Sequence, residues 1–273
     1  MQNILITGCS TGIGLETAHT LKQNNYKVYA TARKKKDVKR LKELGFIAYK
    51  LDTTKPKHTT RVLEKIMLRD GKLDAVFNNA GFGQPGAVED VSTQVLKEQF
   101  ETNLFGLHEV TTQCMKIFRQ QGYGKIIQHS SVLGIISLKF RGAYNASKYA
   151  IEGLADTMRQ ELSGSNIFVS TINTGPVTSK FRENALIKFE ENIDIENSFF
   201  TPTYNSELKE RLVSDKDDTP FNLPPSSVAN VALKIMQSNK PKPRYYVTGA
   251  THILGFAKRI LSTGLLDKLL NRI

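Results

Sequence analysis

The sequence lacks tryptophan and contains only two cysteines, Cys9 and Cys114, among its 273 residues. Neither cysteine has metal-ligand spacing or a cluster of histidines nearby, so we expect no disulfide framework and no zinc site. No apolar run approaches the ~20 residues that cross a bilayer, and the strand-like run Ile4-Leu5-Ile6 begins too early for a signal peptide to precede it. These absences favour a protein of the reducing cytoplasm that holds no metal.

Negative charge is also scarce, because 26 acidic residues stand against 38 basic ones and give a net charge of +12. An excess of this kind can serve nucleic acid, an anionic membrane or an anionic small ligand. The densest basic cluster, residues 33–42, has no interleaved aromatic side chains, and no nucleic-acid-binding motif occurs elsewhere. We therefore expect no nucleic-acid partner, and we interpret most of the cluster as the solvated face of a helix.

Strand-like and helical patterns alternate through the first two-thirds of the chain. The expected strands are Asn3–Thr7, Lys27–Thr31, Ile47–Leu51, Ala75–Phe77, Lys125–His129 and Phe168–Ile172, with a seventh at Arg244–Thr248. The expected helices between them include Ile13–Gln23, Thr59–Arg69, Thr93–Gln121 and Ala143–Glu161. This alternation is typical of an α/β fold whose parallel sheet is covered by helices on both faces. We predict a single domain over residues 1–273, built on a doubly wound, parallel, seven-stranded sheet.

Two segments depart from that alternation. Residues 181–225 are polar, with scattered aromatics and four prolines, and we expect an irregular insertion that covers the substrate. Residues 252–273 predict one or two amphipathic helices broken near Gly264. A basic amphipathic helix can lie on an anionic membrane, but we favour packing of this tail against the domain or a partner subunit.

A glycine-rich turn follows the first expected strand and precedes the first helix. Such a turn lets the backbone approach a pyrophosphate, which then lies at the helix N-terminus. The residues predicted to hold the dinucleotide here are Gly8, Ser10, Thr11, Gly12, Ile13 and Gly14.

The end of the second strand bears on which dinucleotide is bound. An NAD site usually places an acid there for the ribose hydroxyls, but the strand ends in Ala32 and Arg33, and no acid occurs before Asp37. A guanidinium at Arg33 suits a 2′-phosphate through bidentate hydrogen bonds. We therefore predict NADP(H) in preference to NAD(H).

Tyr144 and Lys148 are four residues apart, so they share one face of a helix. An ammonium beside a phenol favours the phenolate and is expected to lower the pKa of the tyrosine. Such a pair is common on solvated helix faces, so its meaning depends on the motifs upstream of it.

Taken in order, the glycine turn, Asn78-Asn79-Ala80-Gly81, Ser131 and Tyr144-x-x-x-Lys148 resemble a short-chain dehydrogenase/reductase over nearly the whole chain. The resemblance implies a Rossmann fold and an oxidoreductase. Two further runs, Ala30-Thr31-Ala32-Arg33 and Gly175-Pro176-Val177, are similar to the hydroxysteroid and retinol dehydrogenase-like branch. Phe77 to Gly83, the run around Tyr144, and Lys240 to Tyr245 resemble bacterial NADP-dependent aldehyde reductases.

The resemblance also implies a role for each matching residue. The catalytic set is Asn103 for a proton relay, Ser131 to orient substrate, Tyr144 as proton donor and Lys148 as its activator. The resemblance also implies contacts with the cofactor. Tyr144 and Lys148 belong to this set, and Asp52 is expected at the adenine. Residues Asn79, Ala80 and Gly81 are expected beside the cofactor, where their motif stabilises the sheet, and Gly175, Pro176, Val177 and Ser179 at the nicotinamide. Thr174 departs from the family's usual proline, and Ser179 stands where a threonine is common.

The expected activity is hydride transfer between NADP(H) and a lipophilic carbonyl or alcohol. Leu133, Ile135, Ile136 and Leu138 predict either a lipophilic pocket or core packing, and the sequence leaves both open. The aldehyde reductase resemblance favours medium- or long-chain aldehydes, and steroid or retinoid substrates are the alternative. A non-catalytic dinucleotide-binding sensor on the same fold is a further alternative, and a homo-oligomer is compatible with the sequence.

Overall fold

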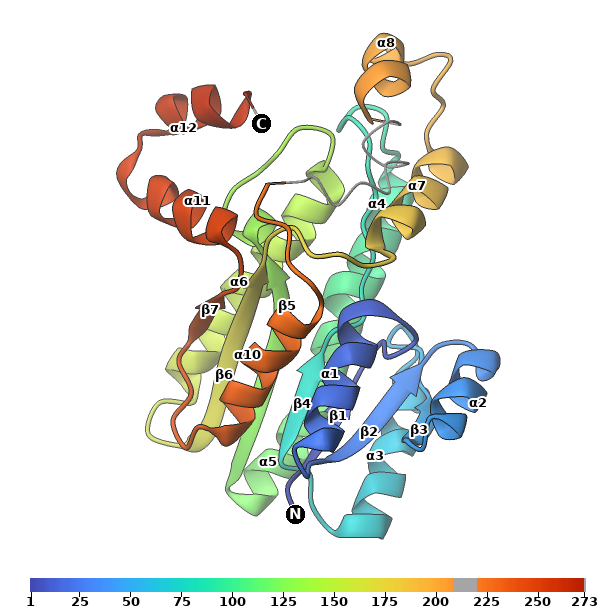
Figure 1. Cartoon of the computed structure of the whole chain (residues 1–273), viewed down its shortest axis with the longest axis vertical. Helices are drawn as coiled ribbons and strands as arrows, with labels where there is room; N and C mark the ends of the chain where they lie inside the picture. Colours follow the sequence, from blue (N-terminus) through green and yellow to red (C-terminus); the bar gives the residue numbers. More distant parts are fainter. Residues whose placement is uncertain (209–219, 273) are drawn as a thin grey trace.

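All strands run in the same direction and form one sheet with the order β3-β2-β1-β4-β5-β6-β7 (Figure 1). The computed structural model describes residues 1–208 and 220–272. The strands are β1 Asn3–Ile6, β2 Lys27–Ala32, β3 Ile47–Lys50, β4 Ala75–Asn78, β5 Tyr123–Ser131, β6 Asn166–Thr174 and β7 Arg244–Tyr246. This confirms the predicted doubly wound parallel sheet of seven strands. The winding reverses between β1 and β4, where ligands of such sheets bind beyond the carboxyl ends of the strands.

Side chains along each central strand alternate between the two faces of the sheet. In β1, Ile4 and Ile6 pack on one face and Leu5 on the other. The first face is covered by α1 Gly12–Gln23, α2 Lys35–Glu43 and α10 Ser226–Gln237, and the second by α3 Pro56–Asp70, α5 Gly106–Gln121 and α6 Gly142–Glu161. Because both faces are buried, the strands read as continuous apolar runs.

The helix expected over Thr93–Gln121 is interrupted in its middle. It consists of α4 Thr93–Phe100, a π-helical turn η1 at Glu101–Phe105, and α5. Asn103 lies within this turn. Single π-helical turns occur often at functional sites, because the extra residue re-aims the side chains beside it.

The insertion is not irregular throughout, which corrects the prediction for residues 181–225. It contains α7 Phe181–Asn192, the short helix α8 Thr201–Thr203 and a π-helical turn η3 Tyr204–Leu208, while residues 209–219 lie outside the described part. The sequence of α7 has almost no apolar periodicity, and the helix buries only Ala185 and Phe189, which lie one turn apart. Phe189 packs edge-to-face on Tyr204 with ring centroids 5.0 Å apart, and this tertiary contact holds the segment.

The tail forms two helices, α11 Gly249–Ile260 and α12 Thr263–Leu270. The break lies at Leu261 and Ser262 rather than at Gly264, because both residues are extended and Ser262 is the N-cap of α12. One side of each helix packs on the domain, with Leu266 and Leu270 buried against the 3₁₀ turn η2 Val132–Gly134 and its neighbours. Across the described residues, no helix is both long and apolar enough to cross a membrane.

Candidate active site

The carboxyl ends of β1, β4, β5 and β6 bring most of the predicted residues to one place (Figure 1). The glycine turn, residues 79–81, Ser131, Tyr144, Lys148 and residues 174–179 lie around the switch point between β1 and β4. Arg33 and Asp52 follow β2 and β3, one and two strands further along the sheet.

The glycines of the first turn are required by close backbone contacts. A Cβ at Gly14 would lie 2.3 Å from the Gly8 carbonyl oxygen and 2.5 Å from the Asn79 side-chain nitrogen. Gly8 has φ +73°, and a Cβ there would lie 2.9 Å from the Cα of Ala80. Any side chain at these positions would push the turn away from the strands, so the spacing of the motif has a direct steric cause.

Asn79 and Thr7 join this turn to the end of β4. The Asn79 side-chain nitrogen donates to the Thr7 and Gly8 carbonyl oxygens at 3.0 and 3.1 Å. The Thr7 hydroxyl accepts from the backbone nitrogens of Asn79 and Ala80, both at 3.0 Å. The sequence indicated Asn79 and Ala80 but not Thr7, whose hydroxyl accepts the hydrogen bonds of both backbone nitrogens.

The residues at the start of α1 fit the pyrophosphate of a dinucleotide. Its N-cap, Thr11, is extended and makes no side-chain bond to the first turn, and that turn contains no acid. The first amide hydrogens of α1 therefore point outward at the positive end of the helix dipole, which suits an anion.

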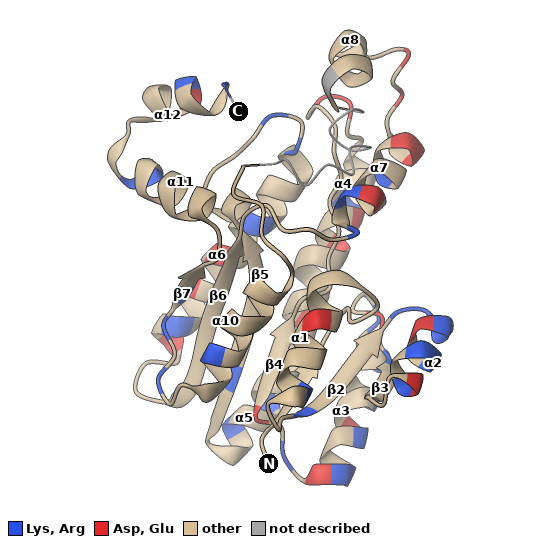
Figure 2. Cartoon of the chain, viewed as in Figure 1, with Lys and Arg blue, Asp and Glu red and all other residues tan. Residues whose placement is uncertain are grey.

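Two arginines lie near the outer side of this turn. Arg33 is exposed and has no hydrogen bond or ion pair within the described ranges 1–208 and 220–272. Arg40 on α2, which the sequence did not single out, donates to the Ser10 carbonyl oxygen and lies 3.9 Å from Asp37. Figure 2 shows the basic segments of α2 on this side of the molecule.

Tyr144, Lys148 and Glu152 follow one another at four-residue intervals on α6; Lys148 and Glu152 are buried and Tyr144 is partly buried. The Lys148 ammonium donates to the His129 carbonyl oxygen at 2.6 Å and lies 5.5 Å from the centroid of the Tyr144 ring. The Ser131 hydroxyl lies beside Tyr144, donates to the Thr174 carbonyl oxygen at 3.2 Å and accepts from the backbone nitrogen of Leu133 at 3.1 Å.

Its neighbour Ser130 is directed elsewhere. The Ser130 hydroxyl has no hydrogen-bond partner among the described residues and lies where a Cβ on Gly134 would come within 2.8 Å of it. The structure therefore brings Ser131, and not Ser130, to Tyr144.

Burial controls the protonation of this pair. It raises the pKa of Tyr144 to about 12, although the hydrogen bond with Ser131 and the charge of Arg141 lower it. Burial also lowers the pKa of Lys148 to about 8, against the opposing charge of Glu152. The expected lowering of the tyrosine pKa by the lysine is thus wrong for the chain alone, because desolvation of the phenolate outweighs the neighbouring charges.

Asn103 fixes the segment that follows Gly81. Its side-chain oxygen accepts from the Phe82 nitrogen at 3.0 Å, and its nitrogen donates to the Phe82 oxygen at 2.9 Å. The same nitrogen lies 3.3 Å from the Ser147 hydroxyl of α6. The side chain therefore connects the π-helical turn to the helix that carries Tyr144.

His129 is a central residue that the sequence did not indicate. Its Nδ1 lies 3.1 Å from the Asn79 side-chain oxygen and its Nε2 lies 2.9 Å from the Thr174 hydroxyl. Because the Asn79 amide nitrogen is used on the glycine turn, Nδ1 must donate and Nε2 must accept. Burial, followed by the charge of Lys148, lowers the pKa of His129 to about 3, so the ring stays neutral.

The segment after β6 closes the far side of the site. A Cβ on Gly175 would lie 2.0 Å from the Thr248 hydroxyl oxygen, and a Cβ on Gly12 would lie 3.2 Å from the Cβ of Ser179. Ser179 therefore lies against the glycine turn, and Gly175 lies against the start of α11. Thr174 can replace the family's usual proline because its hydroxyl is bonded to His129.

Phe181, the first residue of α7, connects the insertion to the reactive tyrosine. Its ring meets that of Tyr144 edge-on, with centroids 5.3 Å apart. Further along, the Tyr204 hydroxyl donates to Asp90 and accepts from the Ala87 nitrogen, so the insertion is fastened to the loop after β4. No local pattern in the sequence predicts these contacts.

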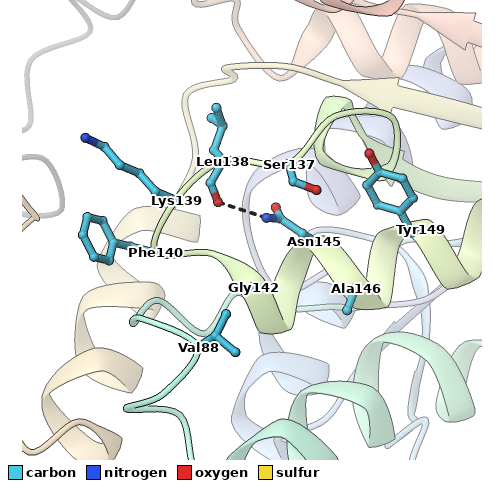
Figure 3. A pocket seen from close by; sticks show the side chains of 9 residues that line it. All are labelled: Val88, Ser137, Leu138, Lys139, Phe140, Gly142, Asn145, Ala146 and Tyr149. Atoms are coloured by element: carbon cyan, nitrogen blue, oxygen red, sulfur yellow. Dashed lines mark hydrogen bonds between the residues drawn. The ribbon is translucent and has the colours of Figure 1, made fainter. Parts of the chain in front are cut away.

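A cavity of about 590 Å³ lies on another face of α6 (Figure 3). Asn145, Ala146 and Tyr149 line it, and Asn145 bonds to the Leu138 carbonyl oxygen at 3.0 Å at its edge. These positions point away from the row of Tyr144 and Lys148. The lining of the cavity also includes Leu138 and Phe140, from the segment between Ser131 and Tyr144.

Comparisons with known proteins agree with this arrangement. Residues 2–188 match the family model described as short chain dehydrogenase. The chain is 37% identical over 270 residues to the uncharacterized oxidoreductase YbbO of Escherichia coli (strain K12), covering 98% of this chain and 94% of that protein. It is 30% identical over 255 residues to retinol dehydrogenase 8 of Bos taurus, covering 89% and 80%. The closed form of serine dehydrogenase complexed with NADP+ shares the fold, with a TM-score of 0.78 at 19% identity over 92% of this chain and 96% of that one.

The chain belongs to the short-chain dehydrogenase/reductase family and is an oxidoreductase. This confirms the resemblance seen in its motifs.

Proposed function

We propose that the protein is an NADP(H)-dependent reductase of lipophilic carbonyl compounds, with medium- or long-chain aldehydes as its substrate class. The observation that carries this proposal is the placement of Tyr144 beside Ser131, with the buried Lys148 one turn along α6. A non-catalytic sensor has no need of a proton donor held in this way.

When bound, the nicotinamide supplies a hydride for the carbonyl carbon. The Ser131 and Tyr144 hydroxyls then donate hydrogen bonds to the carbonyl oxygen, on which negative charge develops. Tyr144 releases its proton to that oxygen, and its raised pKa keeps it protonated until then. Lys148 stabilises the resulting phenolate.

Asn103 acts in the return of the proton to Tyr144. The side-chain amide of Asn103 already makes hydrogen bonds to Phe82 and Ser147. We therefore infer that the backbone of the π-helical turn, and not this amide, positions the relay water. Gly8 to Gly14, Asn79 to Gly81 and Gly175 to Ser179 would hold the dinucleotide, with Asp52 at the adenine.

NADP(H) is favoured over NAD(H) by the two arginines. The exposed guanidinium of Arg33 is free to pair with a 2′-phosphate, and Arg40 adds positive charge beside Ser10. The end of β2 itself carries no acid for an unphosphorylated ribose, since the first acid that follows is Asp37 on α2, which lies 3.9 Å from Arg40.

The lipophilic substrate is favoured by the apolar cover of the site. Leu133 and Ile136 are buried against the tail helices and therefore belong to the core. Ile135 and Leu138 are only partly buried. Phe181 places an aromatic ring on Tyr144 itself. The relation to retinol dehydrogenase 8 favours a retinoid as the second candidate class.

Oxidation of NADPH and of NADH, measured in parallel across aldehydes of increasing chain length, retinal and steroid ketones, tests the proposal. We expect the highest kcat/KM for NADPH with a long-chain aldehyde. In Arg33→Asp, kcat/KM for NADPH should fall by about thirtyfold, the loss of one charge-assisted phosphate contact. Faster turnover with NADH in the unaltered protein would refute the choice of cofactor.

A further inference from the structure

The tail helices have an exposed apolar row in addition to their buried side. On α11 this row consists of Ile253, Phe256 and Ile260, which share a face by their spacing, and the last two are 63% and 62% exposed. On α12 it consists of Leu265 and Leu269. Together these five large apolar side chains, exposed on two consecutive helices, are called the tail patch here, and exposure of this kind marks an interaction surface.

Cationic side chains lie on the same two helices and just beyond them. Lys258 and Arg259 lie in the last turn of α11, and Lys268 and Arg272 follow on α12 and just beyond it. All four are exposed, and the only acid of the segment 249–272 is Asp267, so its net charge is +4 − 1 = +3. Figure 2 shows blue segments on both helices within largely uncharged ribbon.

The patch lies next to the active site. The buried sides of α11 and α12 pack on Val132, Leu133 and Ile136, in a cluster that also contacts Tyr144. Both helices lie beyond the carboxyl ends of the strands, at the end of the molecule opposite the N-terminus (Figure 1).

We propose that α11 and α12 dock the protein on the surface of an anionic phospholipid membrane. Charge decides between this partner and a second copy of the chain, because a two-fold contact through the patch would place +3 against +3, whereas an anionic bilayer complements it. An apolar row inserted at the headgroup level, with Lys and Arg on the remaining surface of the same helices, is the arrangement of an interfacial helix. Docking there brings the mouth of the site to the membrane, which suits the proposed lipophilic substrate.

Sedimentation with vesicles tests the docking without reference to catalysis. The full chain is mixed with vesicles of phosphatidylcholine alone, or of phosphatidylcholine and phosphatidylglycerol in equal parts. We expect it to pellet with the anionic vesicles and to stay in solution with the neutral ones. In Phe256→Gln/Ile260→Gln, binding should weaken by at least about tenfold, because two apolar side chains no longer leave water.

Two control variants match these changes elsewhere on the surface. Leu68→Gln alters a residue that is 88% exposed on α3, and Lys35→Glu/Lys36→Glu reverses two charges in the basic cluster of α2. Both should bind vesicles within about twofold of the unaltered chain, because neither lies on the docking face. The proposal is overturned if the full chain does not bind anionic vesicles, or if the double glutamine variant binds them with unchanged affinity. It is also overturned if sedimentation velocity shows that the unaltered chain is a dimer and that the variant is a monomer.

Because vesicle binding is measured without NADPH, its failure would leave the proposed reductase activity standing. Conversely, an inactive protein that binds vesicles through Phe256 and Ile260 would refute the activity alone.

Discussion

The two sides of the candidate site are built in different ways. The sheet side consists of small polar residues, and Asn79, His129 and Thr174 are linked by hydrogen bonds of 2.9 to 3.1 Å between strand ends. The outer side consists of the insertion and the tail, where aromatic contacts such as that of Phe181 on Tyr144 predominate. A hydrogen-bonded network fixes reacting groups within narrow limits, whereas apolar packing tolerates change. The chemistry is therefore expected to depend on the sheet side and the choice of substrate on the outer side.

The largest effect is expected from Tyr144→Phe on the sheet side. Loss of the hydroxyl removes the proton donor, so kcat should fall by about a thousandfold, while NADPH still binds with unchanged affinity. Steady-state turnover and fluorescence titration with NADPH measure the two quantities. Tyr149→Phe on the other face of the same helix is the control and should keep its activity; unchanged turnover in Tyr144→Phe would sink the mechanism.

Gly14→Ala should break the cofactor side through sterics alone. Its Cβ would lie 2.3 Å from the Gly8 oxygen, so the free energy of unfolding is expected to fall by about 1–3 kcal/mol. NADPH affinity should fall with it, because the turn must move. Gly153→Ala, in a helix where the added Cβ meets nothing within 4 Å, should instead raise stability slightly in urea denaturation. Equal behaviour of the two variants would contradict the steric argument.

Acid should weaken the hydrogen-bonded network through His129. Its pKa of about 3 lies below that of a histidine in the unfolded chain, so protons bind preferentially to the unfolded state as the pH falls. The contribution is fully present above pH ~6.5 and is lost on acidification, by about 2 kcal/mol at pH 5. Urea denaturation at pH 7 and pH 5 measures it. The loss should shrink in His129→Asn and persist in His108→Gln, which alters an exposed histidine of α5.

The smallest effect is expected on the outer side, from Phe181→Ala. Removing the ring should raise KM for a long-chain aldehyde by about fivefold, because the substrate loses part of the free energy of one aromatic contact. The value of kcat should stay nearly unchanged. A short aldehyde serves as the internal control and should show no change. A fall in kcat equal to that of Tyr144→Phe would contradict the claim that the chemistry depends only on the sheet side.

This division also explains what the sequence could predict. The sheet, the glycine turn and the row on α6 follow from local patterns, since strand alternation and the Tyr144–Lys148 spacing are visible within a few residues. His129 and Thr7 act through partners about 45 to 73 residues away, so nothing near them in the chain marks them. Helix α7 was missed because two buried side chains give no periodic signal. The pKa of Tyr144 was misjudged because spacing reveals a neighbouring charge but not the burial that opposes it.

Transfer of a labelled hydride tests the central claim most directly. NADPH deuterated at the transferring position of the nicotinamide is incubated with the protein and a long-chain aldehyde, and the product is analysed by mass spectrometry. The account predicts a primary alcohol that carries one deuterium on the former carbonyl carbon, formed by the unaltered protein and not by Tyr144→Phe. Tight binding of NADPH without any labelled alcohol from aldehydes, retinal or steroid ketones would contradict it and would identify a dinucleotide-binding protein that does no chemistry.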